Sequence, residues 1–208
     1  MPPELLDARA QAIQGKPRYL SMVSGVELGV HGVCFIGYHA RSRARGILAH
    51  TINSFAFARI SLNGRELGEA GIYGALAGAY GAPVIAASGD DAFIAETRDL
   101  FPHASFVQTK RATGAGSGIS LSPERACAAI REGVAKAVVR VGQARPFCID
   151  GPVTVVLEAQ SVALADLFCQ WPTLERIAPD ALRFTAPDTE SAVRMINCLS
   201  AMSSMLRS

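Results

Sequence analysis

The strongest constraint on the fold is an alternation between short apolar runs and segments with helical spacing. Four apolar runs bounded by Gly, Pro or Asp are typical of strands buried on both faces, at 32–38, 82–88, 104–109 and 151–159. Helical patterns occupy the segments between and after them, at 90–101, 122–141 and 188–206. Strands that alternate with helices predict a layered α/β architecture with a largely parallel sheet.

Local signals indicate where several elements begin and turn. Ser122 precedes a proline, as an N-cap precedes the first helical residue, and Asp188 takes the capping position before the last helix. Residues 57–67 alternate in polarity around Asn63-Gly64, the dipeptide that most strongly predicts a two-residue hairpin turn. We therefore expect a central β-hairpin in addition to the parallel sheet.

Composition narrows the classes of protein. Of the 208 residues, 50% are hydrophobic and only 18% are charged, which indicates that part of the surface is buried against other subunits. The net charge is +2 with acids and bases interspersed, whereas a nucleic-acid surface has a basic patch or stripe. No apolar run approaches the roughly 18 residues of a membrane span. We therefore expect neither a nucleic-acid nor a membrane partner.

The expected location is the cytoplasm. Residues 1–18 lack the charged-then-apolar order of a signal peptide. The five cysteines are odd in number, form no CxxC pair and stand mostly in apolar stretches. This usage predicts reduced core residues in a reducing compartment.

Two of the four histidines stand eleven residues apart. His39 follows the first predicted strand, and ligands of open α/β sheets bind beyond the carboxyl ends of the strands. A neutral imidazole there is a good zinc ligand, although a hydrogen-bonded structural histidine is the commoner case. The intervening loop can bring His50 back beside His39, where it could transfer protons or stabilise an oxyanion. An ordinary surface or core histidine is the alternative for His50.

Three acidic residues near element ends are further candidates. Glu69 opens a Gly-rich helix predicted at 69–81, where an acid ordinarily complements the helix dipole. Its alternative role is that of a metal ligand. Asp90 and Asp91 end the second predicted strand, and they either cap the next helix or support a site from behind its ligands.

Two groups of basic residues allow two interpretations each. Arg41, Arg43 and Arg45 lie in the loop between the histidines, and Lys110 and Arg111 follow the third predicted strand. Solvated charge is the ordinary interpretation of such groups. The alternative is that Arg41 or Lys110 holds an anionic part of a substrate.

Several familiar catalytic motifs are absent from the sequence. It contains no GxSxG nucleophile elbow, no GxxxxGK[ST] phosphate loop and no HExxH zinc helix. The segment GAGSG at 114–118 resembles a dinucleotide loop only superficially, because no strand–turn–helix unit surrounds it.

Five short motifs in order resemble the bacterial D-aminopeptidase family, the dipeptide-operon zinc metallopeptidases: FIGYHAR, GILAHT, LNGRELGEAG, PVIAASGDD and LSPERA. The resemblance extends from KPRYLSMVSG to the terminal helix. It implies a three-layer α/β fold, a pair of zinc ions per subunit and a homo-oligomer, a decamer of two stacked rings. It also implies an activity that releases N-terminal residues, typically D-amino acids such as D-Ala, from short peptides.

The same resemblance assigns roles by motif. His39 and Glu69 match metal ligands, and His50 matches the catalytic histidine. Members of the family also carry an S-x-D-x-E-G strand and a D-S-H-like motif, and neither occurs here. We therefore expect an N-terminally truncated chain, in which 1–145 is the C-terminal part of the metal-binding domain. Residues 146–208 form either a second α/β lobe or a continuation of that domain.

Three functional hypotheses follow. The first is a zinc aminopeptidase whose metals polarise the scissile carbonyl and generate a hydroxide nucleophile for a short peptide substrate. The second is a metal-poor, non-catalytic subunit that acts through oligomer assembly, because the ligand set is incomplete. The third is a sugar- or nucleotide-binding domain without metal, suggested by GAGSG and the arginine loop.

Overall fold

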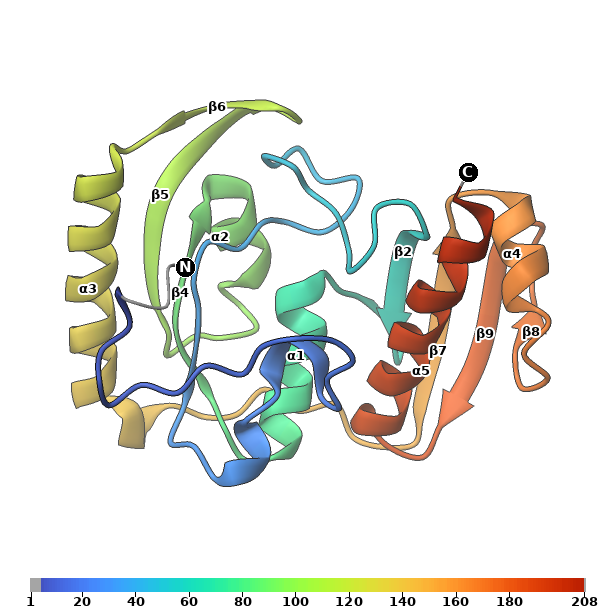
Figure 1. Ribbon diagram of the computed structural model, residues 1–208, viewed down its shortest axis with the longest axis horizontal. Coiled ribbons are helices and arrows are strands. Elements are labelled where there is room, and N and C mark those ends of the chain that lie inside the picture. Colours follow the sequence, from blue (N-terminus) through green and yellow to red (C-terminus); the bar gives the residue numbers. More distant parts are fainter. Residues whose placement is uncertain (1–4, 208) are drawn as a thin grey trace.

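The computed structural model describes residues 5–207, which form two β-sheets with helices packed on them (Figure 1). Sheet A has the strand order β1-β4-β5-β6, and sheet B has the order β3-β2-β7-β9-β8. The strands are β1 Val33–Phe35, β2 Phe57–Leu62, β3 Arg65–Glu66, β4 Val84–Asp90, β5 Ser105–Gly114, β6 Ser117–Ser120, β7 Val153–Ala159, β8 Glu175–Arg176 and β9 Ala181–Ala186. The helices are α1 Glu69–Ala79, α2 Asp91–Thr97, α3 Pro123–Val139, α4 Val162–Phe168 and α5 Thr189–Met202, with 3-10 turns η2 Ser21–Val23, η3 Val26–Leu28, η4 Val141–Gln143 and η5 Ser203–Leu206.

Sheet A is the largely parallel sheet that the alternating pattern predicts. β1, β4 and β5 run parallel, and only β6 returns antiparallel to β5. The central strand β4 is buried along its whole length because α3 covers one face of the sheet and α2 the other, giving three layers (Figure 1). The mixed α/β fold is therefore confirmed.

The predicted hairpin forms, and it belongs to the second sheet. Asn63 and Gly64 adopt φ values of 47° and 78°, as a two-residue turn between β2 and β3 requires. The Asn63 side chain also accepts a hydrogen bond from the Thr154 N–H (2.7 Å), and β2 pairs antiparallel with β7. Strands after residue 146 therefore share a sheet with an earlier segment. This pairing favours a continuation of one domain. The division into residues 1–145 and 146–208 stays a prediction.

Several expectations about single elements were wrong. β7 alternates between buried and half-buried residues, because sheet B is antiparallel and packs helices α4 and α5 against it. β5 extends beyond the predicted 104–109 to Gly114, and the turn at 115–116 joins it to β6, so 114–118 covers the turn and the strand ends beside it. The segment GAGSG is therefore a hairpin connection, and β8, β9 and α4 were not predicted. The cysteines are free, but four of the five are exposed and are not core residues.

One hydrophobic core connects the two sheets. Helix α1 packs against α5, and buried residues from both halves belong to the same cluster, among them Phe35, Tyr73, Phe57 and Leu157. Ser122 and Asp188 cap α3 and α5 as predicted. Among residues 5–207, no helix has both the length and the apolar character needed to cross a bilayer.

Candidate metal centre

The turn after β1 places His39 at the carboxyl end of sheet A. Gly37 has a φ of 75°, and its N–H donates to the buried Ser88 hydroxyl on β4 (2.9 Å). The Tyr38 N–H donates to the Ser88 carbonyl (2.9 Å), so the chain leaves the strand in a fixed direction. The Nδ1 of His39 lies 3.0 Å from the Ala40 carbonyl oxygen. This contact leaves Nε2 available to bind a metal ion.

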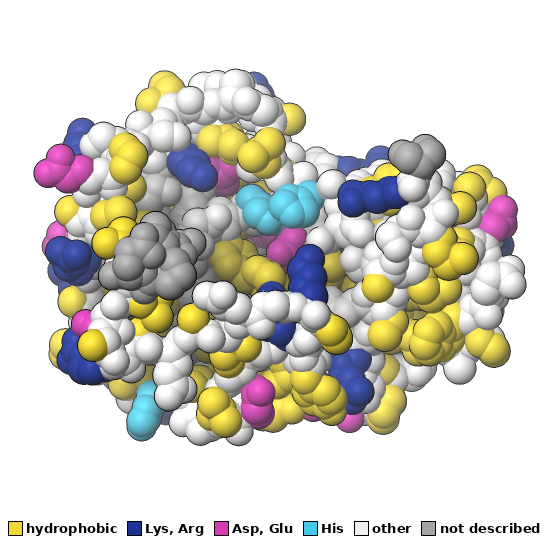
Figure 2. Space-filling model, viewed as in Figure 1, with side chains coloured by type: hydrophobic (Ala, Val, Ile, Leu, Met, Phe, Trp, Pro, Cys, Tyr) yellow, Lys and Arg dark blue, Asp and Glu magenta, His cyan; other side chains and the backbone are white. Residues whose placement is uncertain are grey.

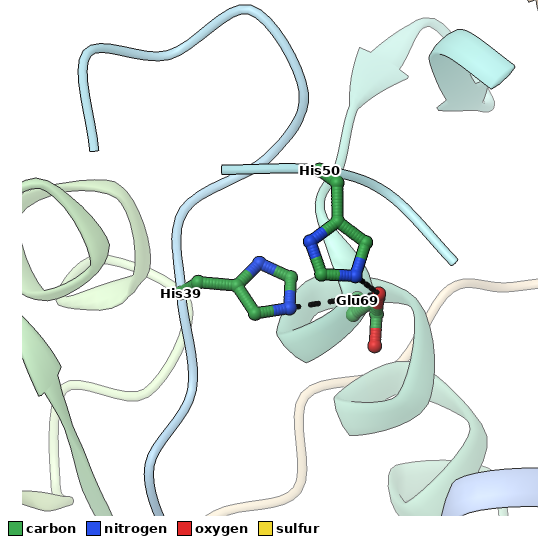
Figure 3. A group of neighbouring side chains, drawn as sticks. All are labelled: His39, His50 and Glu69. Atoms are coloured by element: carbon green, nitrogen blue, oxygen red, sulfur yellow. Dashed lines mark ion pairs between the residues drawn. The ribbon is translucent and has the colours of Figure 1, made fainter. Parts of the chain in front are cut away.

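The 41–50 loop folds back and brings His50 onto His39. Their rings stack with centroids 3.9 Å apart and planes inclined by 17° (Figure 3). The His50 N–H donates to the Ala40 carbonyl (3.2 Å), and its Nδ1 lies 2.8 Å from the Leu48 carbonyl. As in His39, this contact orients the ring and leaves Nε2 directed toward the cluster.

Glu69 is the third member of the cluster and the first residue of α1. Its side chain is buried, and its Oε1 lies 3.3 Å from His50 Nε2 and 3.7 Å from His39 Nε2 (Figure 3). The same oxygen accepts a hydrogen bond from the Ile52 N–H (2.8 Å). Ile52 has a φ of 60°, which is strained for a β-branched residue, and this bond helps to hold it there.

The chemistry and spacing of these three groups fit zinc. The cluster offers two imidazole nitrogens and one carboxylate oxygen, all within 4.8 Å of one another. Around a tetrahedral zinc with bonds of about 2.0–2.1 Å, ligand atoms stand about 3.3 Å apart. The two histidine–glutamate distances are close to that value. A catalytic zinc site typically has three protein ligands and an open position, and His39 and Glu69 match two of those ligands.

Arg41 lies beside this cluster and is already paired. Its guanidinium contacts Glu66 on β3 (3.0 Å) and Glu96 on α2 (3.1 Å), and its N–H also donates to Glu96. Burial raises the pKa of Glu96, and the bonds from Arg41 oppose that effect. Arg41 therefore ties the start of the 41–50 loop to two elements and is not a free anion-binding group.

The remaining candidates lie outside the cluster. Asp90 caps α2 by accepting from the Phe93 N–H (2.8 Å), as expected, and its other oxygen accepts from the Ile47 N–H (2.6 Å). It therefore supports the loop that carries His50. Asp91 accepts from a β5 backbone N–H, which lowers its pKa. Lys110 lies within β5, not past its end, because that strand is longer than predicted.

A cavity beside Glu69 was not predicted. Its volume is about 610 Å³, and its walls come from 16–22, Ile52–Asn53, α1, the end of α5, η5 and Arg207. These segments lie far apart in the sequence and share no motif. Only the folded chain brings them together, so no local signal pointed to the cavity.

Fold and cluster together define an α/β protein with a His/His/Glu metal-type centre at the end of a parallel sheet. The D-aminopeptidase family model matches residues 1–198, and the chain belongs to that family. A D-aminopeptidase of Bacillus subtilis (strain 168) is 31% identical over 144 residues, which are 69% of this chain and 52% of that protein. The chain thus spans about half the length of this curated relative.

A solved structure agrees with this assignment. The Zn-dependent D-aminopeptidase DppA from Bacillus subtilis, described as a self-compartmentalizing protease, matches with a TM-score of 0.92 at 25% identity. The match covers 99% of this chain and 74% of that chain. The resemblance seen in the five motifs is therefore confirmed for the fold and the family.

Proposed function

We propose that the protein is a zinc-dependent aminopeptidase that removes N-terminal D-residues, such as D-Ala, from short peptides. The observation that carries the proposal is the convergence of the metal-ligand candidates His39 and Glu69, with His50 Nε2 3.3 Å from the same Glu69 oxygen. Membership of the D-aminopeptidase family and the likeness to a zinc-dependent relative support it. When bound, zinc supplies Lewis acidity and lowers the pKa of a water nucleophile.

The burial of the three side chains supports different roles for them, metal binding for two and catalysis for one. His39 and Glu69 hold the metal, and the Ile52 N–H fixes the carboxylate oxygen that faces both rings. The His50 side chain is 35% exposed against 20% for His39, so His50 is the ring more accessible to a substrate. We assign His50 the transfer of a proton or the stabilisation of the oxyanion.

The proposal extends to a second zinc ion per subunit, a homo-oligomer that is a decamer, and a cytoplasmic location. The likeness to a self-compartmentalizing relative supports the homo-oligomer. Large apolar side chains on the surface of the single chain also support it, among them Leu28, Leu48 and Val139, which are 71–86% exposed. Five free cysteines suit a reducing compartment.

A second candidate is a metal-poor subunit that acts through assembly alone. With His50 assigned to proton transfer, the cluster offers two ligands, His39 and Glu69, fewer than the three protein ligands that a catalytic zinc ion typically takes. Two observations count against the sugar- or nucleotide-binding hypothesis. GAGSG forms a hairpin connection, and Arg41 of the arginine loop is paired with acids.

The proposed activity is tested by release of D-Ala from D-Ala-D-Ala with zinc added, and L-Ala-L-Ala measures stereochemical preference. We expect His50→Ala to abolish turnover while zinc stays bound, and His39→Ala to lose both. His103→Ala is the control, since His103 is exposed and lies outside the cluster. A chain that neither binds zinc nor hydrolyses either peptide would favour the metal-poor assembly role.

A further inference from the structure

The cavity beside the metal centre is lined by residues to which the proposed function assigns no role, apart from Glu69. It shares Glu69 with the cluster, whereas His39 and His50 do not line it, so the two adjoin at that carboxylate. Lys and Arg side chains lie next to the histidine pair, on the face where the two halves of the molecule meet (Figure 2). The cavity therefore adjoins the site at Glu69.

The lining of this cavity is positively charged. Lys16, Arg18 and Arg207 contribute three cations, and Glu69 is the single acid among the lining residues. Within residues 5–207, none of the three cations lies within 4 Å of a carboxylate. An excess of one sign of charge in a concave site attracts a ligand of the opposite sign.

Two of the cations are held in position by the protein. The Arg18 Nε donates to the Ser21 carbonyl (3.0 Å) and its Nη1 donates to the Gly15 carbonyl (2.7 Å). Nη2 is left for a ligand. The Arg207 guanidinium lies over the Phe55 ring, 5.2 Å from its centroid. A guanidinium fixed in this way loses little entropy on binding, and its planar fork matches a carboxylate.

The rest of the lining is polar and neutral. The Tyr73 hydroxyl donates to Asn197 Oδ1 (3.0 Å), and burial raises the pKa of Tyr73 to about 12, so it carries no charge near neutral pH. The Asn53 amide donates to Ser200 and Ser203. None of these groups cancels the charge of the arginines.

We propose that this cavity binds the C-terminal carboxylate of a short peptide whose N-terminal residue lies at the metal centre. Arg18 is the principal partner of the carboxylate, and Lys16 and Arg207 support it. A cavity of this volume takes a small ligand and not a folded chain. Because the cavity begins at Glu69 of the cluster, the carboxylate of a short peptide held at the metal centre would lie inside it. The inference rests on the proposed function and adds a preference for short peptides with a free carboxylate.

The experiment compares D-Ala-D-Ala with its C-terminal amide in the wild type, Arg18→Gln, Arg207→Gln and the control Arg131→Gln. Arg131 is exposed on α3 and does not line the cavity. We expect the wild type and the control to prefer the free acid by about 10- to 100-fold in kcat/KM, the range for one charge-assisted interaction. We expect Arg18→Gln to bring this preference close to one, mainly through KM, and Arg207→Gln to reduce it less.

Binding measured by calorimetry separates failure of this inference from failure of the proposed function. If both peptides are cleaved equally by the wild type, the activity stands and the carboxylate site is wrong. If neither is cleaved, tighter binding of the free acid that depends on Arg18 still supports the site. Equal binding of acid and amide, or no binding of either, overturns it. Arg207 is exposed, so the Arg207→Gln variant keeps the test valid if Arg18→Gln fails to fold.

Discussion

The metal cluster and the cavity next to it are built in opposite ways. His39, His50 and Glu69 come from one stretch of 31 residues, at a strand end, a loop and a helix start. The cavity combines residue 16 with residue 207, and its walls are joined only by tertiary contacts. The residues proposed for the chemical step therefore lie close together in the sequence, whereas the groups proposed to select the substrate are brought together only by the packing of the whole chain.

The largest effect should come from a change inside the cluster that leaves the fold intact. Glu69→Gln keeps an oxygen that can accept from the Ile52 N–H but removes the charge that a metal needs. Substitution of a residue that hydrogen-bonds a metal ligand typically lowers metal affinity or activity by about 10- to 100-fold. Substitution of a ligand itself should therefore lower zinc affinity by more than about 100-fold. Activity and zinc affinity are measured together. An unchanged zinc affinity would show that Glu69 is not a ligand.

An intermediate effect should come from Asp90, which links the local site to the rest of sheet A. Its carboxylate accepts from both the Phe93 and the Ile47 N–H. In Asp90→Asn, only one amide oxygen remains, so one of the two N–H groups loses its acceptor. We expect a loss of about 1–3 kcal/mol in the free energy of unfolding, together with reduced activity because the His50 loop is released.

The matched control for this change is Asp188→Asn. Asp188 accepts from a single backbone N–H at the start of α5, and Asn is an equally good N-cap. Chemical denaturation should therefore find the control close to the wild type. If the two variants are equally stable, the hydrogen bond from the Ile47 N–H to Asp90 does not contribute to the free energy of unfolding.

The smallest effect concerns Glu190, which lies outside both the cluster and the cavity lining. Glu190 on α5 accepts hydrogen bonds from Tyr19 and Tyr80 (2.6 Å each), and these bonds lower its pKa. A depressed carboxylate pKa stabilises the fold above the ordinary value of 4.5, and this contribution is lost as the pH falls through the folded pKa.

Glu190→Gln removes this pH dependence. Its Tm should therefore lie below that of the wild type at about pH 7 and approach it at about pH 3, where the wild-type carboxyl is protonated. Differential scanning calorimetry across that range measures the difference. A constant gap between the two Tm values would contradict the assignment.

What the sequence could predict follows the same division. The hairpin at Asn63-Gly64 and the caps Ser122 and Asp188 depend on a few adjacent residues, and all three are present. The eleven-residue spacing allowed His39 and His50 to meet but did not require it. Their roles came from the resemblance carried by the five motifs. The alternation in β7 was overlooked, although Thr154 and Glu158 mark its more exposed face. The cavity required contacts between the two ends of the chain, which no local pattern encodes.

The most direct test of the central claim is the zinc content of the purified 208-residue protein after dialysis against zinc, by elemental analysis. We expect at least one zinc ion per chain in the wild type, in His50→Ala and in the His103→Ala control. We expect His39→Ala to lose that zinc. A wild-type chain without zinc, or a His39→Ala variant that binds as much as the wild type, would contradict the assignment of this cluster as the metal centre.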